Sequence, residues 1–561
     1  MYQRVAVAAA LLAIVVVTLG ATGEPIRARH GMVVSQEPLA TAIGVEVLRE
    51  GGSAVDAAVA TAFALAATHP TAGNIGGGGF LVYRPATGVP VAYDFREMAP
   101  AASTQEMFLV EGEYDAERHH NSHISVGVPG TVAGLHLAWS EQGRLPWQRL
   151  VQPAIELARY GFVLSHRLAS SLEAVLPRMQ RYPASIAKFS KNGESYQSGE
   201  LFTQLDLAGT LARISEHGPE GFYGGETARL IAAEMQANGG LITVDDLAAY
   251  EAKKRPPIRG TYRGYEIISM PPVSSGGTAL VQMLNILEGY DLRASGYASA
   301  QTVHVIVEAM RRAYADRARY LGDPDFNPTM PIERLVSKSY AERLRRTILG
   351  SRASRSSPDS FEWPSEGEET THFSIVDAER NAVSMTYTLE QGYGSKIVVP
   401  GGGFLLNNEM GDFNGGPGLT TEQGLIGTQP NLAESGKRML SSMTPTILTK
   451  DGHLFMVTGT PGGRTIINTV LHTILNVIDF EMNIQAAVDA PRFHHQWLPD
   501  RIAYERHGLS PDTIALLKSH GHTLDQRSSQ GVAQAIVVDA AENLLEGAAD
   551  RRSAGSTAAG Y

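Results

Sequence analysis

The chain has 561 residues, 43% of them hydrophobic and 19% charged, which predicts a large globular protein of two lobes or one elaborate domain. Its formal net charge is −11 and it holds no concentrated basic run, so nucleic acid is not an expected partner. The absence of cysteine excludes thiol catalysis, disulfide bonds and thiolate metal sites.

The N-terminus differs in character from the rest of the chain. Arg4 precedes an apolar run at 5–17, and small residues follow up to Gly23. A short basic start, about 13 apolar residues and small residues after them are typical of a secretory signal peptide. We therefore expect residues 1–23 to direct export to the periplasm or the cell exterior. The apolar run is shorter than the about 20 residues that a membrane span needs. An uncleaved anchor that tethers the protein to the membrane is the alternative.

The next segments predict helices and then a strand. Residues 38–70 carry apolar side chains at helical spacing, interrupted at Gly51-Gly52, and predict two helices. Four glycines at 76–79 then lead into a predicted strand at 81–83. A phosphate-binding loop would continue with Gly-Lys-Ser/Thr and a helix. We therefore expect these glycines to allow close backbone packing. Helical spacing returns at 300–321.

Several other stretches carry weaker signals. The sequence holds no Gly-x-Ser-x-Gly, which argues against a serine hydrolase with a nucleophile elbow. Histidines cluster at 119–123 and 494–495 without a His-Glu-x-x-His. We interpret them as surface or packing histidines and expect no metal. Arg96 follows a predicted strand at 91–93, and it either pairs with a neighbouring acid or binds a substrate carboxylate.

The most informative stretch is Thr370-Thr371, at the start of a predicted strand. A polar segment rich in serine and proline, 351–369, precedes it and is expected to be a flexible connection. If the bond before Thr370 is cut, that residue has both a hydroxyl and a free α-amine, which can take the hydroxyl proton. An α-amine has a pKa of about 7.7–8.0, suitable for a base near neutral pH. Alternatively, the two adjacent threonines are ordinary β-branched strand residues without a catalytic role.

A second predicted strand, 382–389, follows after a turn and forms a hairpin with the first. A turn centred just after Glu379 would place Thr371 opposite Thr388, one residue out of step with Thr370. The Thr388 hydroxyl would then lie within reach of Thr370.

Ten motifs together resemble the γ-glutamyltranspeptidase family of Ntn hydrolases. In chain order they are EGGSAVDAAVA (50–60), THPTAGNIGGGGF (68–80), DFREMAP (94–100), PGTVAGL (129–135), TTHFSIVD (370–377), TYTLEQGYGS (386–395), LLNNEMGDFN (405–414), LSSMTPTI (440–447), GTPGGR (459–464) and APRFHHQWLPD (490–500). The resemblance extends from about residue 30 to the C-terminus without large gaps. It implies an α+β fold, the four-layer αββα sandwich of Ntn hydrolases.

The resemblance also implies an exported precursor that cuts itself between Glu369 and Thr370. The Thr370 hydroxyl would attack the Glu369 carbonyl, and water would open the resulting ester. A large subunit, 24–369, and a small subunit, 370–561, would stay associated as a heterodimer. No cofactor and no metal are implied.

By the same resemblance, the activity is that of a γ-glutamyltransferase or glutathione hydrolase. A γ-glutamyl compound such as glutathione would acylate Thr370, and water or an acceptor amino acid or dipeptide would release the acyl group. The implied catalytic residues are Thr370, its hydrogen-bonding partner Thr388, and the oxyanion-binding amides of Gly462 and Gly463. The implied substrate-binding residues are Arg96, Ser441 and Ser442 for the α-carboxylate, and Glu409 and Asp412 for the α-ammonium.

Two positions depart from the family pattern. Glu390 stands where the best-known members carry asparagine, in the part of the pocket that contacts the substrate amino group, and could shift affinity or pH dependence. Gln423 stands where bacterial members carry tyrosine, within the stretch 417–441 that resembles a lid. A weaker lid would admit water and favour hydrolysis over transfer.

Two rival functions remain open from the sequence. A glutaryl (cephalosporin-type) acylase would use the same scaffold, but its substrate lacks the α-ammonium, so the carboxylates at Glu390, Glu409 and Asp412 argue against it. A catalytically silent binding homologue would be expected to lose the nucleophile or the oxyanion glycines, yet both are present.

Overall fold

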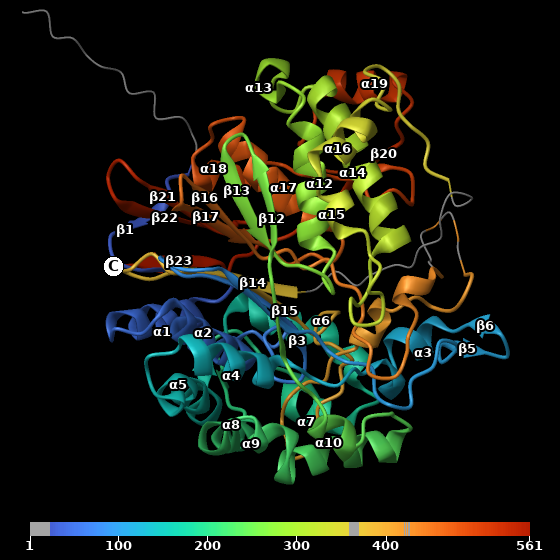
Figure 1. Ribbon diagram of the computed structural model, residues 1–561. Coiled ribbons are helices and arrows are strands. Elements are labelled where there is room, and N and C mark those ends of the chain that lie inside the picture. The colour runs from blue at the N-terminus through green and yellow to red at the C-terminus, as the bar shows by residue number, and fades with distance from the viewer. Residues whose placement is uncertain (1–22, 358–369, 420, 422, 424–426) are drawn as a thin grey trace, which may run out of the picture.

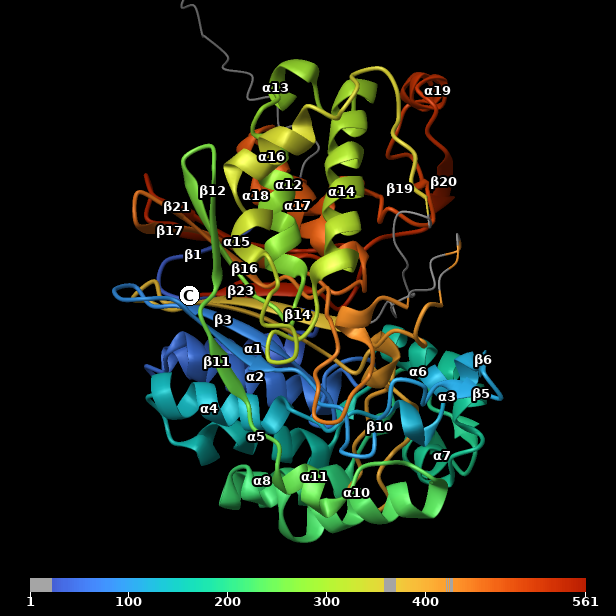
Figure 2. The same cartoon turned by 45° about the vertical axis from the view of Figure 1, so that its right-hand side comes forward.

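The computed structural model describes residues 23–357, 370–419, 421, 423 and 427–561. The signal-peptide prediction for 1–22 and the cleavage residue Glu369 lie outside the described residues. Two seven-stranded sheets lie face to face, and helices cover both outer faces (Figures 1 and 2). This arrangement is the predicted four-layer αββα sandwich. None of the helices in the described residues is long and apolar enough to cross a membrane.

Both sheets are antiparallel throughout and mix strands from before and after Thr370. The first contains, in spatial order, β1 (Ile26–Ala28), β22 (Leu544–Ala549), β21 (Gln534–Asp539), β17 (His453–Gly459), β16 (Thr446–Lys450), β13 (Tyr265–Ser269) and β12 (Ile258–Tyr262). The second contains β11 (Lys253–Arg255), β4 (Val91–Phe95), β3 (Gly78–Arg84), β15 (Ala382–Thr388), β14 (Thr370–Val376), β2 (Met32–Ser35) and β23 (Thr557–Gly560). Apolar side chains from the two inner faces form one buried cluster between the sheets.

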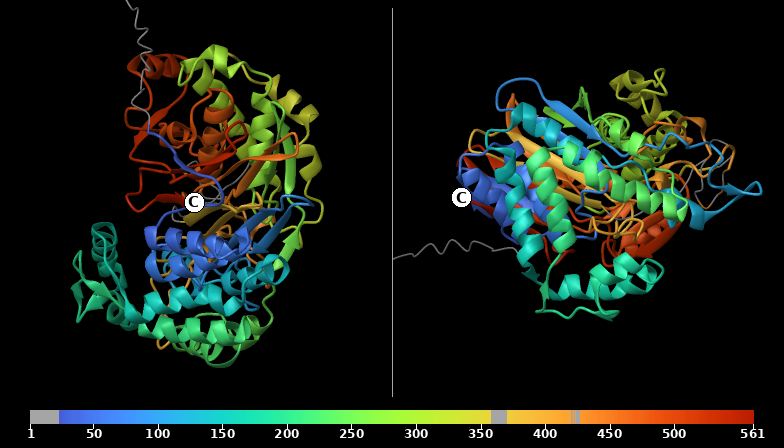
Figure 3. Two further views of the ribbon diagram at one scale, coloured as in Figure 1. Left: turned by 90° about the vertical axis from the view of Figure 1, so that its left-hand side faces the viewer. Right: turned by 90° about the horizontal axis from the view of Figure 1, so that it is seen from below.

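One outer layer covers the second sheet. Its helices include α1 (Pro38–Arg49), α2 (Ala54–Thr68), α4 (Thr131–Gln142), α5 (Trp147–Tyr160), α8 (Leu205–His217), α9 (Glu220–Tyr223) and α10 (Gly225–Asn238). The teal segment with α6 (His166–Met179) and α7 (Pro183–Phe189) projects beside this layer (Figure 3). The two helices predicted within 38–70 are confirmed: Gly51, with φ +89°, follows α1, and Ser53 begins α2 with a capping box.

The opposite outer layer covers the first sheet. It includes α12 (Gly276–Leu287), α14 (Ala300–Tyr320), α16 (Lys338–Arg345), α17 (Thr465–Ile478), α18 (Ile484–Asp489) and α19 (Pro511–Ser519). Helix α14 confirms the helical pattern predicted at 300–321. Shorter elements complete the described chain: α3 (Ala116–His120), α11 (Val244–Ala248), α13 (Leu292–Ser295), α15 (Ile332–Leu335), β5 (Leu109–Val110), β6 (Glu113–Tyr114), β7 (Phe162–Val163), β8 (Ser190–Lys191), β9 (Glu194–Ser195), β10 (Leu201–Phe202), β18 (Phe493–His494), β19 (Ile502–Glu505) and β20 (Leu524–Arg527).

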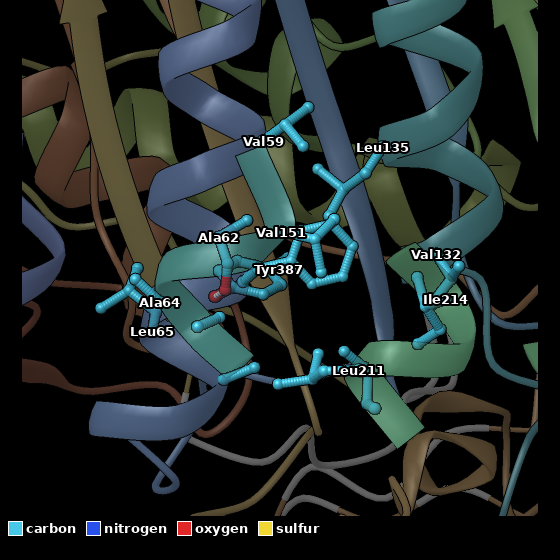
Figure 4. Packing of buried hydrophobic residues seen from close by; sticks show 14 of the residues in the cluster. Val59, Ala62, Ala64, Leu65, Val132, Leu135, Val151, Leu211, Ile214 and Tyr387 are labelled. Atoms are coloured by element: carbon cyan, nitrogen blue, oxygen red, sulfur yellow. Dashed lines mark hydrogen bonds between the residues drawn. The ribbon is translucent and has the colours of Figure 1, made fainter. Parts of the chain in front are cut away.

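Strand β15 is fixed from its outer face by the helical layer. Tyr387 points away from the sheet into a cluster of apolar side chains that includes Ala62, Val151 and Leu211 (Figure 4). Its hydroxyl donates to the Ala62 carbonyl oxygen at 3.0 Å, so the burial of the tyrosine leaves its polar end satisfied. This packing fixes the end of β15, where Thr388 directly follows Tyr387.

The β14–β15 register differs by one residue from the prediction. Thr370 itself, and not its neighbour, lies opposite Thr388. The turn holds an odd number of residues and is centred on Glu379, because the Asp377 carboxylate accepts hydrogen bonds from the backbone N–H groups of Glu379 (3.0 Å) and Asn381 (2.9 Å). In the observed register, the side chains of the two threonines lie on the same face of the sheet.

The glycine run provides the close backbone packing that the sequence predicts. Gly76 and Gly77 precede β3, and Gly78 and Gly79 are its first residues, beside the end of β15. A Cβ at Gly77 would lie 2.0 Å from the Thr388 carbonyl oxygen, and one at Gly79 would lie 2.5 Å from that of Thr386. Any side chain here would displace the strand that carries Thr388.

Residues 351–357, the first part of the predicted flexible connection, make hydrogen bonds to the rest of the protein. The Ser354 backbone N–H donates to Glu308 at 3.0 Å, and that of Ser356 donates to Asp500 at 2.8 Å. Glu308 lies on α14 and Asp500 pairs with Arg311 of the same helix, a non-local partner that the sequence of the segment alone does not reveal. Residues 358–369 lie outside the described residues.

Candidate functional site

Thr370 is the first residue of β14 and is only 6% exposed. Its Oγ1 lies 3.4 Å from Thr388 Oγ1 across the two strands. Thr388 Oγ1 also accepts a hydrogen bond from the Glu390 backbone N–H at 2.8 Å, which orients the hydroxyl. The hairpin therefore places a second, oriented hydroxyl beside the predicted nucleophile.

A small cavity of about 20 Å³ lies beside this pair. Its lining contains eight of the residues that the sequence predicts for the site, together with two apolar side chains. The residues are Arg96, Thr388, Glu390, Glu409, Asp412, Ser441, Ser442 and Gly463, with Met443 and Ile466. Thr370 and Gly462 do not line it, although Thr370 contacts Thr388 and Gly462 precedes Gly463. The fold thus gathers predicted site residues that are up to 367 positions apart in the sequence, from Arg96 to Gly463.

Arg96 is the electrostatic centre of the cavity. It follows the end of β4, is completely buried, and its two terminal nitrogens donate to the carboxylates of Glu409 and Asp412. Its Nε donates to the Met439 carbonyl oxygen at 3.2 Å. Burial opposes the charge, but the carboxylates outweigh it and raise the pKa of Arg96. The arginine therefore pairs with neighbouring acids, one of the two roles that the sequence left open, within the predicted substrate pocket.

Glu97 is a buried acid that the sequence reasoning missed. Its side chain is fully buried, and one oxygen lies 3.6 Å from the Arg96 guanidinium. Burial raises the pKa of Glu97 to about 8, against the opposing effect of Arg96. Burial also raises the pKa of Glu409 well above its ordinary value, again against Arg96. Glu97 belongs to the DFREMAP motif, and a charged residue next to Arg96 was the available signal.

Glu390 also lines the cavity, in a backbone conformation with φ +78° that side chains rarely adopt. Its carboxylate accepts from the Asn408 side-chain amide and lies 3.7 Å from His120 Nδ1. Burial lowers the pKa of His120 to about 4, so this imidazole is neutral at pH 7 and does not neutralise Glu390.

The serine pair lies on a loop that the opposite sheet supports. The backbone N–H of Ser275 donates to the Ser441 carbonyl oxygen at 2.8 Å, and the Ser441 N–H donates to the Val273 carbonyl oxygen at 3.1 Å. Ser441 Oγ accepts from the Met443 N–H at 3.1 Å. These contacts fix the loop against the turn between β13 and α12 and place both serines at the cavity wall.

Gly462 and Gly463 form the turn that leads into α17. Both have positive φ angles, +132° and +53°, which glycine adopts without strain. Their carbonyl oxygens accept from the N–H groups of Thr465 (3.0 Å) and Ile466 (3.1 Å). The turn thus stands at the N-terminus of a 14-residue helix, where the peptide dipoles favour negative charge.

The histidine clusters pack inside the protein. His119 Nε2 lies 3.1 Å from the Met410 carbonyl oxygen, and His494 Nδ1 lies 2.7 Å from the Asn468 side chain. The packing role predicted for these two residues is confirmed. His119 and His120 are the last two residues of helix α3.

One group in the described part of the chain has the spacing to hold a metal ion: His304, Glu308 and His522. The sequence reasoning did not single it out. Glu308 already accepts hydrogen bonds from Arg312 at 2.6 Å and from Ser354 at 2.5 Å. A metal ion would have to compete with these contacts, so the group is explained as a structural polar cluster.

Known proteins resemble the chain over most of its length. A family model described as Gamma-glutamyltranspeptidase matches residues 40–560. Glutathione hydrolase proenzyme from Escherichia coli (strain K12) is 48% identical over 545 residues, which cover 96% of this chain and 93% of that relative.

Solved structures agree in fold. The crystal structure of cephalosporin acylase from Bacillus halodurans aligns with a TM-score of 0.85 and 28% identity, covering 97% of this chain and 98% of that one. The crystal structure of Helicobacter pylori gamma-glutamyltranspeptidase aligns with a TM-score of 0.56 and 46% identity, covering 59% of this chain and 93% of that one. The fold and the family that the sequence predicted are confirmed. The chain belongs to the gamma-glutamyltranspeptidase family.

Proposed function

We propose that the protein is an autoprocessing γ-glutamyltransferase and glutathione hydrolase, with Thr370 as its nucleophile. The observation that carries the proposal is the juxtaposition of Thr370 and Thr388 with a cavity that holds groups of both charges. Family membership supplies the reaction class, and the cavity supplies the chemistry for its substrate.

Maturation would begin with attack of Thr370 Oγ1 on the Glu369 carbonyl carbon. The peptide C–N bond breaks as the nitrogen of Thr370 leaves as an amine, and water then hydrolyses the ester. The products are a large subunit ending at Glu369 and a small subunit beginning at Thr370. The new α-amine is the base that the mature nucleophile requires.

The two subunits would stay together after the cut because their strands alternate in both sheets. In the second sheet, β14 and β15 of the small subunit lie between β2 and β3 of the large one. In the first sheet, β16 pairs with β13 of the large subunit, and β22 pairs with β1. Separation would break several backbone ladders and open the shared core.

In the mature enzyme, Thr370 Oγ1 would attack the γ-carbonyl carbon of a γ-glutamyl amide while the Thr370 α-amine takes the hydroxyl proton. The backbone amides of Gly462 and Gly463 would stabilise the oxyanion at the N-terminus of α17. The leaving amine takes a proton as the acyl ester forms. Water would then release glutamate, or the amine of an acceptor amino acid or dipeptide would take the acyl group.

The α-carbon of the donor carries a carboxylate and an ammonium group, and the cavity offers partners for both. Arg96, Ser441 and Ser442 would bind the carboxylate, and the acids at Glu409 and Asp412 would bind the ammonium. Glu390 would add negative charge on the ammonium side. The two α-groups of the donor have opposite charges, so their binding would not change the net charge of the pocket, in which Arg96 contacts Glu409 and Asp412 directly.

A glutaryl acylase is the second candidate, favoured by the alignment with cephalosporin acylase. A glutaryl group would bring a carboxylate but no ammonium to a cavity lined by three acids, Glu390, Glu409 and Asp412. Those acids would then lose hydration without gaining a cation.

The test is a direct comparison of donors. Purified, processed protein is supplied with glutathione and with a glutaryl amide, separately and in competition, and product amines are quantified. We expect glutathione to be the better substrate. A higher kcat/KM for the glutaryl amide would establish the acylase, and turnover of neither would favour the catalytically silent homologue.

Export remains part of the proposal, with periplasmic or extracellular location and membrane tethering if the signal segment is retained. The Gln423 effect also remains a prediction: the residue is exposed, and most of its immediate neighbours lie outside the described residues. Strong stimulation of turnover by glycylglycine would contradict a preference for hydrolysis.

A further inference from the structure

Helix α14 carries a buried arginine that reaches the serine pair from behind the cavity. Arg317 is 2% exposed and does not line the cavity itself. Its Nη2 donates to Ser442 Oγ at 3.1 Å, and its Nε donates to Ser275 Oγ at 2.7 Å. Ser275 Oγ in turn donates to the Ser441 carbonyl oxygen at 2.6 Å. One guanidinium group therefore holds both serines, one directly and one through Ser275.

The direction of these hydrogen bonds suits an anion in the cavity. A guanidinium group only donates, so Ser442 Oγ is the acceptor in its contact with Arg317. A hydroxyl that accepts from a cation is polarised to donate its own proton, the polarity that a carboxylate oxygen requires. The planar fork of Arg317 also fixes the relative position of the Ser441 and Ser442 segments, which a lysine could not reproduce.

The charge of Arg96 is already shared with acids. Its terminal nitrogens both donate to carboxylates, and a third acid, Glu97, lies 3.6 Å away. A donor carboxylate that approaches Arg96 therefore meets a cation that is already paired with acids, and those of them that are ionised repel it. A second positive charge on the serine side would offset that repulsion.

We propose that Arg317 is a positioning residue for donor recognition: through Ser442 and Ser275 it sets the serine pair to bind the donor's α-carboxylate and supplies positive charge on that side of the cavity. This inference rests on the proposed γ-glutamyl donor specificity. Arg317 would thus act selectively on recognition of the donor's α-carboxylate and not only support the fold.

Removing one group from the donor tests this selectivity. The γ-glutamyl p-nitroanilide carries both α-groups, and the 4-aminobutanoyl p-nitroanilide lacks only the α-carboxylate. Wild type, Arg317→Met and Arg317→Lys are compared with both donors as processed protein of verified mass. Arg311→Met is the matched control, because Arg311 lies on the same helix and is 4% exposed. It contacts Glu308, Asp500 and Ser356, and not Ser275 or Ser442.

For Arg317→Met we expect kcat/KM with the γ-glutamyl donor to fall by about 10- to 100-fold, mainly through KM, the range for a hydrogen-bonded charge. With the 4-aminobutanoyl donor it should fall by less than about 3-fold. Arg317→Lys should recover part of the loss. Arg311→Met should change kcat/KM by the same factor for both donors, whatever its effect on stability.

An equal loss with both donors for Arg317→Met would overturn the inference and leave the proposed function intact. If wild type turns over no γ-glutamyl donor, the proposed function itself fails. Inhibition constants of L-glutamate and 4-aminobutanoate provide a second measurement that does not depend on turnover of the truncated donor. The inference requires Arg317→Met to weaken inhibition by L-glutamate and to leave inhibition by 4-aminobutanoate within about 3-fold.

Discussion

Thr388 lies directly opposite Thr370 across the β14–β15 ladder, and their hydroxyl oxygens are 3.4 Å apart. The facing pair follows from the turn at Glu379, where Asp377 fixes an odd number of turn residues. A hydroxyl in this position can accept from the nucleophile or donate to it as the proton moves.

Thr388→Val tests this contact, because valine keeps the branched shape of threonine and removes the hydroxyl. We expect kcat to fall by about 3- to 10-fold, the usual range for one neutral hydrogen bond, with KM for the γ-glutamyl donor little changed. Steady-state kinetics of the processed protein measure the effect. Thr388→Ser, which keeps the hydroxyl, is the control, and equal loss in both variants would show that the methyl group matters instead.

Glu390→Asn introduces the residue that the family resemblance predicts at this position and replaces the carboxylate on the proposed ammonium side of the cavity by an amide. We expect KM for a γ-glutamyl donor to rise by on the order of 10-fold, because a charge-assisted contact is lost. The glutaryl donor should bind no worse. A KM that is unchanged or lower in Glu390→Asn would show that this carboxylate does not contact the ammonium.

Glu97 predicts a pH dependence of stability. Its folded pKa is raised to about 8 by burial, above an unfolded value of about 4.3. The folded state therefore holds the proton more tightly, and this stability is present below about pH 4.3 and is lost as pH rises through 8.

Glu97→Gln keeps the shape of the neutral acid and removes the titration. Between pH 5 and 8, the free energy of unfolding of wild type should fall relative to Glu97→Gln by on the order of 1 kcal/mol per pH unit. Urea denaturation at several pH values measures the difference. Parallel curves for the two proteins would show that Glu97 is charged throughout this range.

The glycine run predicts a contrast between two glycine-to-alanine changes. In Gly77→Ala the new Cβ would meet the Thr388 carbonyl oxygen at 2.0 Å, so we expect a loss of about 1–3 kcal/mol or more. In Gly209→Ala, within α8, the nearest atom is 3.8 Å away, and a gain of about 0.5–1 kcal/mol is expected. The denaturant midpoints of the two variants measure these changes in stability. Equal midpoints for both variants would contradict the close packing of the glycine run.

Sequence reasoning reached the fold, the family and most of the cavity, because those features reside in local patterns and ordered motifs. Arg96 is far in the chain from Glu409 and Asp412, yet the motifs placed the three in one pocket. What it could not predict was which of them contact each other: the ion pairs of Arg96 depend on side-chain directions after the sheets have packed.

The errors share a physical origin. The hairpin register depends on the number of residues in the turn, which is set by the hydrogen bonds that the Asp377 side chain accepts from two backbone amides. The amino-acid composition of the turn does not determine these hydrogen bonds. Arg317 was not identified because its role arises from a helix packed behind the cavity, and its local sequence reads only as an amphipathic helix. The anchoring of Ser354 by Glu308 is non-local in the same way.

The central claim is that Thr370 becomes an N-terminal nucleophile by self-cleavage. The most direct test is the intact mass, under denaturing conditions, of purified wild type, Thr370→Ser and Thr370→Ala. We predict two fragments with a new N-terminus at Thr370 in wild type, the same cut in the serine variant, and one uncleaved chain in the alanine variant. A single uncleaved chain in all three samples, or the same cut in Thr370→Ala, would contradict the claim.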